Sequence, residues 1–124
     1  MSMGPAKKKL LIADDEPTIR LMVRRVFERE YVVLEAKNGK EAVDLALHHT
    51  PDIILMDTMM PETDGLTALN IIKNNKRTSS IPVIMFTGVG SELNEALAMD
   101  LGARAYLRKP VTPQELLDAV SKII

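Results

Sequence analysis

Five short apolar segments alternate along the chain with longer amphipathic stretches. The apolar segments are residues 10–13, 32–35, 53–56, 83–86 and 105–107. The first, third and fourth are continuously apolar, which is typical of parallel strands that are covered on both faces. The second and fifth are more mixed in composition, so we expect them to lie at the edges of a sheet.

The stretches between these segments have the spacing of helices that bury one face. Apolar residues at positions i, i+3, i+4 and i+7 form a continuous stripe on such a helix. The stripes are Ile19, Met22, Val23, Val26 and Phe27; Ala42, Val43, Leu45 and Ala46; Leu66, Leu69 and Ile72; Leu93, Ala96, Leu97 and Leu101; and Leu116, Leu117, Val120, Ile123 and Ile124. The expected helix starts are Pro17, Asn38-Gly39, Gly65, Ser91 and Thr112-Pro113, and Gly102 is expected to be left-handed after the fourth helix.

Regular alternation of strand and helix predicts one α/β domain, with five parallel strands and helices on both faces of the sheet. In such sheets, ligands bind at the carboxyl ends of the strands, beside the point where the strand order reverses. Residues 1–6 lack the apolar stretch of a signal peptide, and we interpret them as a flexible tail or an expression remnant. Residues 7–124 form the predicted domain.

Polar side chains follow four of the five predicted strands. Asp14 and Asp15 follow the first strand, Asp57 the third, Thr87 the fourth and Lys109 the fifth. Taken singly, these residues have ordinary explanations as helix-capping acids, a turn hydroxyl and a solvated lysine. Together they place three carboxylates, a hydroxyl and an ammonium at one edge of the sheet, which is the composition of an active or binding site.

Neighbouring carboxylates at this edge require positive charge or protonation. Two of them about 4 Å apart repel by about 4 kcal/mol at an intermediate dielectric constant, and Lys109 supplies only one positive charge. The all-oxygen ligand set favours a hard divalent cation, and Mg²⁺ suits a site with few carboxylates. Zinc is disfavoured, because the chain has no cysteine and neither His48 nor His49 lies near the predicted site.

The ordered set of residues resembles the receiver domain of two-component response regulators. It consists of Asp14-Asp15-Glu16, the run Asp57-Thr58-Met59-Met60-Pro61-Glu62-Thr63-Asp64-Gly65, Thr87-Gly88 and Lys109-Pro110. The resemblance covers about residues 7–124. It implies a single-domain, doubly wound (βα)5 flavodoxin-like sandwich whose five-stranded parallel sheet has the order 2-1-3-4-5.

The resemblance also implies a role for each matching residue. Asp57 would accept a phosphoryl group, Lys109 would pair with the phosphoryl oxygens, and Thr87 would move inward to hydrogen-bond with them. The Mg²⁺ ligands would be Asp14, Asp15, Asp57 and the backbone carbonyl of Met59, with Asp15 in direct contact. Tyr106 would be the switch aromatic that follows Thr87, and the Lys109–Pro110 peptide bond would be cis.

The implied function is a phosphorelay signalling switch and not an enzyme, since the chain would catalyse only its own phosphorylation and slow dephosphorylation. A histidine kinase or histidine phosphotransfer protein would be the donor, docking near the first helix and the loop after the fifth strand, and Leu21 on that helix is a candidate contact. An unidentified output partner would bind the face formed by the fourth helix, fifth strand and fifth helix. The alternative is a hydrolase such as a haloacid-dehalogenase-like phosphatase, but that family places a second acid where this chain has Met59.

Two residues depart from the pattern of the receiver family. Thr58 is polar at a position that is often apolar, and Met59 occupies a position that flanks the phosphorylation site. A thioether cannot orient an attacking water molecule by a strong hydrogen bond. We therefore predict slow self-dephosphorylation.

Composition and charge narrow the classes of partner. A formal net charge of −1 and the absence of Trp argue against direct nucleic-acid binding. No apolar run approaches the roughly 20 residues that span a bilayer, so we expect no membrane insertion. The absence of cysteine excludes thiol catalysis and fits a cytoplasmic location. Nucleotide binding is disfavoured, because neither a P-loop nor a dinucleotide glycine fingerprint is present.

Overall fold

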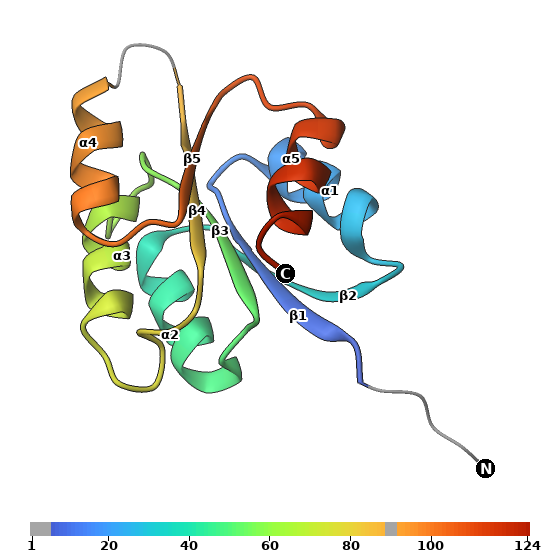
Figure 1. The fold of residues 1–124 in the computed structure, drawn as a ribbon, viewed down its shortest axis with the longest axis horizontal. Helices are drawn as coiled ribbons and strands as arrows, with labels where there is room; N and C mark the ends of the chain where they lie inside the picture. The colour runs from blue at the N-terminus through green and yellow to red at the C-terminus, as the bar shows by residue number, and fades with distance from the viewer. Residues whose placement is uncertain (1–5, 89–91) are drawn as a thin grey trace.

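The structure, a computed structural model, describes residues 6–88 and 92–124, which form alternating strands and helices (Figure 1). The strands are β1 (Lys8–Ala13), β2 (Tyr31–Ala36), β3 (Ile53–Asp57), β4 (Val83–Thr87) and β5 (Ala105–Arg108). The helices are α1 (Pro17–Phe27), α2 (Gly39–His49), α3 (Gly65–Lys73), α4 (Glu92–Asp100) and α5 (Pro113–Ser121). Every predicted strand and helix is present. The predicted cap at Ser91 and residues 1–5 of the predicted tail lie outside the described residues.

The strands form one parallel sheet in the order β2-β1-β3-β4-β5, which confirms the predicted order and fold class. The two strands of mixed composition, β2 and β5, lie at the edges as predicted. The central strands β1 and β3 pair directly, with Ala13 opposite Met56, and β3 continues with Asp57 opposite Phe86 of β4. The carboxyl ends of these strands therefore lie next to one another at one edge of the sheet.

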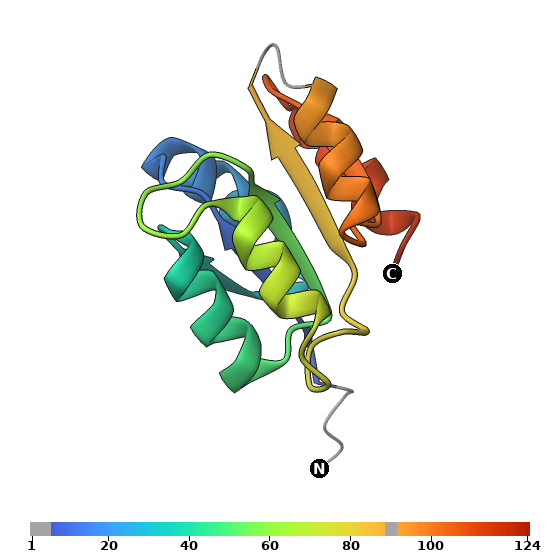
Figure 2. The same cartoon turned by 90° about the vertical axis from the view of Figure 1, so that its left-hand side faces the viewer.

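Helices cover both faces of the sheet, with α2, α3 and α4 on one side and α1 and α5 on the other (Figures 1 and 2). Successive residues of a strand point to opposite faces. On β3, Ile54 and Met56 accordingly pack toward α2, α3 and α4, while Ile53 and Leu55 pack toward α1 and α5. Burial on both faces explains why β1, β3 and β4 have continuous apolar runs.

Among the described residues, side chains cap the first turns of three helices and so define where these helices begin. Asn38 accepts a hydrogen bond from the backbone N–H of Glu41 at the start of α2, and Asp64 does the same for Thr67 of α3. Thr112 forms a reciprocal capping box with Glu115 at the start of α5. Such caps satisfy N–H groups that have no partner within the helix. After α4, Gly102 has a φ angle of 103°, which confirms its predicted left-handed conformation.

The inward faces of α4 and α5 are narrower than the sequence pattern predicts. Ala96 and Leu97 on α4 were expected to be buried but are exposed, and Ala98 is buried instead. On α5, Leu117 is also exposed, although its neighbour Leu116 is buried. Adjacent residues on a helix point about 100° apart around its axis. Both are buried only where the surface that the helix packs against is wide enough to cover both directions.

Candidate functional site

The predicted polar residues meet at the carboxyl edge of the sheet. Asp14 follows the last residue of β1, and Asp57 and Thr87 are the last residues of β3 and β4. Lys109 follows β5 directly, and its backbone N–H donates to the carbonyl oxygen of Thr87 at 2.6 Å. Parallel pairing thus brings four residues that are distant in sequence to one place.

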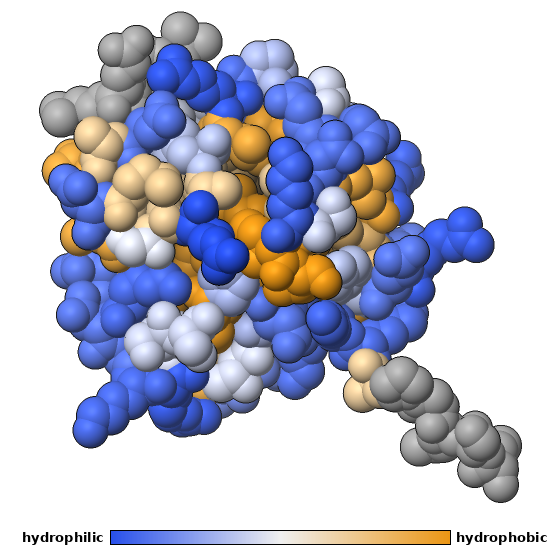
Figure 3. Space-filling model, viewed as in Figure 1, coloured by the Kyte–Doolittle hydropathy of each residue, from blue (hydrophilic) through white to orange (hydrophobic). Residues whose placement is uncertain are grey.

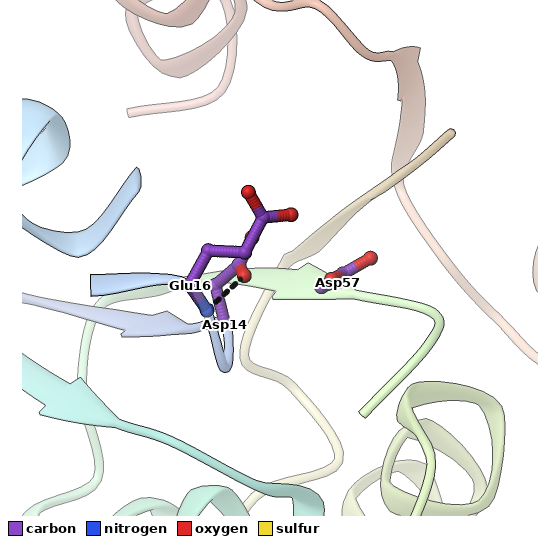
Figure 4. A group of neighbouring side chains, drawn as sticks. All are labelled: Asp14, Glu16 and Asp57. Atoms are coloured by element: carbon purple, nitrogen blue, oxygen red, sulfur yellow. Dashed lines mark hydrogen bonds between the residues drawn. The ribbon is translucent and has the colours of Figure 1, made fainter. Parts of the chain in front are cut away.

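Three carboxylates form the centre of this site (Figure 4). One oxygen each from Asp14, Glu16 and Asp57 lies within 4.8 Å of the others. Asp14 is fully buried and Asp57 is 3% exposed, whereas Glu16 is exposed. The backbone N–H of Glu16 donates to Asp14 Oδ1 at 2.8 Å, and Arg20 of α1 donates to the Asp14 carbonyl at 2.8 Å. These two bonds fix the loop that carries Asp14 against the first helix.

The ammonium group of Lys109 pairs with all three carboxylates. Its Nζ lies 2.9 Å from Asp14 Oδ2, 3.1 Å from Glu16 Oε1 and 3.2 Å from Asp57 Oδ2. The same nitrogen lies 5.4 Å from the centre of the Phe86 ring, a distance at which a cation is attracted by the ring. Lys109 therefore reaches from β5 across β4 to the acids at the ends of β1 and β3.

Burial changes the acidity of the groups in this site. The pKa of Asp57 is raised from 3.8 to about 6, because burial and the Asp14 charge raise it by more than Lys109 lowers it. Burial also raises the pKa of Asp14, although the hydrogen bond from Glu16 and the Lys109 charge lower it in part. The pKa of Lys109 is raised, because its bonds and charges with the acids outweigh burial. One ammonium is thus insufficient to balance the buried carboxylates.

The donor set fits a hard divalent cation. Three carboxylates and one ammonium leave a formal charge of −2. Apart from its ion pair with Lys109, the buried Asp14 Oδ2 has no hydrogen-bond partner among the described residues. Carboxylate oxygens with excess negative charge are suited to bind Mg²⁺. The acidic pocket is therefore compatible with a magnesium ion.

The predicted metal ligands and the observed carboxylate group differ in one member. The exposed side chain of Asp15 is not part of the three-carboxylate group, whereas Glu16, to which the sequence analysis assigned no role, is. The backbone N–H of Met59 lies 3.3 Å from Asp57 Oδ1, so the Met59 main chain lies beside the acid. Metal binding by Asp15 and by the Met59 carbonyl stays a prediction.

The predicted switch residues lie on the side of the sheet that α2, α3 and α4 cover. Tyr106 of β5 is half-buried and packs against that apolar core. Thr87 is buried, and its hydroxyl oxygen accepts a hydrogen bond from the hydroxyl of Thr58. The Lys109–Pro110 peptide bond is cis, the isomer that the family resemblance implies.

Two glycines allow the loop after β3 to pack closely, which sequence reasoning did not predict. A Cβ atom on Gly65 would lie 1.9 Å from the carbonyl oxygen of Asp57, and one on Gly39 would lie 1.9 Å from that of Thr63. The Gly65 N–H also donates to the Thr58 carbonyl at 2.9 Å. The helices α2 and α3 thus press directly on the backbone that positions Asp57. The sequence alone identified Gly65 only as the start of a helix.

Comparison with known protein families agrees with the fold. Residues 10–121 match the response regulator receiver domain. The chain belongs to this family.

The curated relatives that the chain matches are longer than the chain itself. The chain is 39% identical over 117 residues to the transcriptional regulatory protein ResD of Bacillus subtilis (strain 168), a match that covers 94% of this chain and 48% of ResD. It thus spans about half the length of the curated relatives it matches.

Solved structures include a putative response regulator from Chloroflexus aurantiacus J-10-fl, with a TM-score of 0.88 and 32% identity over 95% of this chain and 98% of that one. The chemotaxis protein CheY4 of Vibrio cholerae has a TM-score of 0.89 and 28% identity over 96% of this chain and all of the other.

No helix among the described residues is long and apolar enough to cross a membrane.

Proposed function

We propose that this chain is a phosphorylation-controlled switch in which Asp57 accepts a phosphoryl group from a phosphohistidine donor. The observation that carries the proposal is the placement of the Asp57 carboxylate at a strand end, next to a second buried acid and within 3.2 Å of the Lys109 ammonium. A buried carboxylate is costly, and this one has a pKa of about 6. Such a group fits a role in chemistry better than a role in stability.

In the proposed reaction, an oxygen of Asp57 attacks the phosphorus of the donor. A P–O bond forms, the P–N bond to the donor imidazole breaks, and the leaving nitrogen keeps the electron pair. Water later attacks the phosphorus of the mixed anhydride, which releases inorganic phosphate and regenerates the carboxylate. Phosphoryl transfer depends mainly on positioning and neutralisation of charge, and Lys109 supplies positive charge at the Asp57 oxygen.

We infer that Mg²⁺ is the cofactor, held by Asp57 and Asp14, with Asp15 and the Met59 carbonyl as predicted ligands. When bound, it would neutralise phosphoryl oxygens and the excess negative charge of the acids. Thr87 would donate its hydroxyl to the phosphoryl group, and Tyr106 would change position with it. The output is a shift between two conformations, of which one binds the phosphoryl group better.

A histidine kinase or histidine phosphotransfer protein is the proposed donor, docking on α1. Exposed Leu21 lines a surface hollow together with Met22, Val26 and Pro113, which lies at the start of α5. Its lining is mainly apolar, and Pro113 follows Lys109 by four residues in the sequence. These features support docking of a donor close to Asp57.

We place the output partner on the face formed by α4, β5 and α5, where apolar side chains lie among charged ones (Figure 3). Tyr106 lies on β5, and Leu107 and Ile123 line a hollow between β5 and the C-terminal end of the chain. Location in the cytoplasm stays a prediction, as does the expectation that the chain catalyses only its own phosphorylation and slow dephosphorylation.

Incubation with acetyl phosphate and Mg²⁺ tests the proposal against a phosphatase. Intact-mass measurement is expected to detect one added phosphoryl group on the wild-type chain and none on Asp57→Asn. The control Asp44→Asn changes an exposed acid on α2 and is expected to retain phosphorylation. Repeated turnover of acetyl phosphate without a protein-bound phosphoryl group would favour the enzyme instead.

Met59→Asn is expected to shorten the lifetime of the phosphorylated protein by about fivefold, the equivalent of one hydrogen bond of about 1 kcal/mol. The Met59 side chain is 69% exposed beside Asp57 and cannot orient water by a strong hydrogen bond, whereas an amide can. Loss of the phosphoryl group is followed by intact mass after removal of the donor. Met99→Asn, at an exposed position of α4, is the control, and an equal lifetime for Met59→Asn and wild type contradicts this explanation.

Mg²⁺ is expected to stabilise the folded protein through Asp14. At ten times its dissociation constant, a ligand of the folded state raises the free energy of unfolding by about 1.4 kcal/mol. Urea denaturation with and without Mg²⁺ measures this stabilisation. It is expected to be small in Asp14→Asn and the same as in the wild type in Asp44→Asn. Equal stabilisation of wild type and Asp14→Asn would show that the ion binds elsewhere.

A further inference from the structure

A buried hydrogen bond joins the residue after Asp57 to the predicted switch residue. The hydroxyl of Thr58 donates to the hydroxyl oxygen of Thr87 at 2.5 Å. Thr58 is 2% exposed and Thr87 is 1% exposed, so water does not compete for this bond. Since Thr58 is bonded covalently to Asp57, the hydrogen bond connects the proposed phosphorylation site to the end of β4.

The main chain of Thr58 is fixed on two sides. Its N–H donates to the carbonyl of Phe86 on β4 at 3.0 Å, and its carbonyl accepts from the N–H of Gly65 on α3 at 2.9 Å. Thr58 therefore cannot follow Thr87 freely when Thr87 moves. A shift of Thr87 by about 1 Å or more stretches the bond beyond ordinary hydrogen-bond length.

The bond lies on the opposite side of the sheet from Asp57. Alternation along β3 and β4 places Thr58 and Thr87 with Met56 and Met85, on the face covered by α2, α3 and α4. By the same alternation, Asp57 shares the side of Leu55, which packs toward α1 and α5. To reach a phosphoryl group on Asp57, the Thr87 hydroxyl must leave its position beside Thr58.

We propose that Thr58 is a positioning residue that holds the Thr87 hydroxyl away from Asp57 and so stabilises the unphosphorylated conformation. This inference rests on the proposed function and adds a residue that restrains the switch. Loss of the Thr58 hydroxyl removes a stabilising bond from one conformation only, so the balance moves toward the conformation that binds the phosphoryl group. A protein that spends more time in this conformation binds a phosphoryl mimic more tightly.

The test compares the affinity of variants for beryllofluoride, a tetrahedral mimic of the phosphoryl group, at saturating Mg²⁺. Thr58→Val keeps the shape of the side chain but removes the hydroxyl. Its dissociation constant, measured by calorimetric titration, is expected to be about fivefold lower than that of the wild type, which corresponds to one buried hydrogen bond. Thr58→Ser retains a hydroxyl and is expected to restore the wild-type affinity.

Thr78→Val is the matched control for a purely structural effect. Thr78 is fully buried and donates its hydroxyl to the Ile72 carbonyl at 2.7 Å, away from the site. Its substitution is expected to lower the free energy of unfolding and leave the beryllofluoride affinity unchanged. If Thr58→Val does not fold, Thr58→Ala removes the same hydroxyl and is measured in its place.

The outcomes separate this inference from the proposed function. One possible outcome is that the wild type binds beryllofluoride and the variant that lacks the Thr58 hydroxyl binds it equally well or more weakly. In that case the proposal that Thr58 restrains Thr87 is wrong, while the proposed phosphorylation switch is unaffected. If the wild type itself does not bind beryllofluoride in the presence of Mg²⁺, the proposed function fails and the inference with it. A rise in affinity in Thr58→Val but not in Thr78→Val or Thr58→Ser supports the restraint.

Discussion

Asp57→Asn is expected to increase the free energy of unfolding of the metal-free protein by about 3 kcal/mol above pH 7, while it abolishes phosphorylation. The carboxylate is buried, and its pKa rises from 3.8 to about 6 on folding, mainly through burial and the Asp14 charge. A shift of one pKa unit corresponds to 1.36 kcal/mol. The neutral amide of Asn avoids this cost but cannot form an acyl phosphate.

The stability difference between the two proteins is expected to depend on pH. Because the pKa of Asp57 is raised in the folded state, the folded protein binds the proton more tightly than the unfolded chain. Wild-type stability is therefore lost as pH rises from about 3.8 through about 6, and the loss is complete above this range. At pH 4, Asp57 is protonated in the folded protein and partly protonated in the unfolded chain, so the difference in stability between wild type and Asp57→Asn is expected to be much smaller than at pH 8.

Urea denaturation between pH 4 and pH 8 in the presence of a chelator measures this prediction. Asp44→Asn, an exposed acid on α2, is the control and is expected to track the wild type at every pH. A variant Asp57→Asn that is less stable than the wild type at pH 8 would contradict the electrostatic account. Addition of Mg²⁺ is expected to reduce the difference, since the ion compensates the carboxylate charge only in the wild type.

Gly65→Ala is expected to destabilise the protein by about 3 kcal/mol, the upper range for side chains that have no space. The added Cβ would lie 1.9 Å from the Asp57 carbonyl oxygen and 2.8 Å from the Thr58 Cα. Both are backbone atoms, so the end of β3 or the start of α3 must move. Phosphorylation is expected to decrease as well, because the displaced segment carries the acceptor.

Gly88→Ala provides the control for this substitution. Apart from Gly88 itself and its two chain neighbours, no atom would lie within 4 Å of a Cβ at this position, so the effect of Gly88→Ala on stability is expected to be below about 1 kcal/mol. The midpoints of urea denaturation of the two variants are compared with that of the wild type. Similar midpoints for all three proteins would mean that the loop after β3 yields to the new side chain at little cost.

The sequence predicts the fold well, because the alternation of strands with helices and the need to bury apolar strands on both faces allow few arrangements of the sheet. Strands that are apolar throughout require cover on both faces, and only central parallel strands receive it. The mixed segments therefore go to the edges, as β2 and β5 do. The errors at Leu97 and Leu117 have a different origin, since periodicity shows which residues could face a core but not how wide the covered surface is.

The sequence predicts those site residues whose position follows from being directly at the end of a strand. Asp14, Asp57, Thr87 and Lys109 follow strands, and parallel pairing brings strand ends together without further information. The contact between Thr58 and Thr87 depends instead on which face each side chain occupies at the end of its strand. The position of Glu16 beside Lys109 depends on how the loop before α1 turns, which local sequence does not determine.

The hydrogen bond from Arg20 to the Asp14 carbonyl links helix α1 to the position of an acid in the site. Leu21, the proposed docking residue, is the next residue on α1, so the surface that selects a donor belongs to the same helix that fixes an acid of the site. Changes on α1 that alter the choice of donor are therefore expected to alter the binding of Mg²⁺ as well. Partner specificity and the chemistry of Asp57 would then evolve together in this protein.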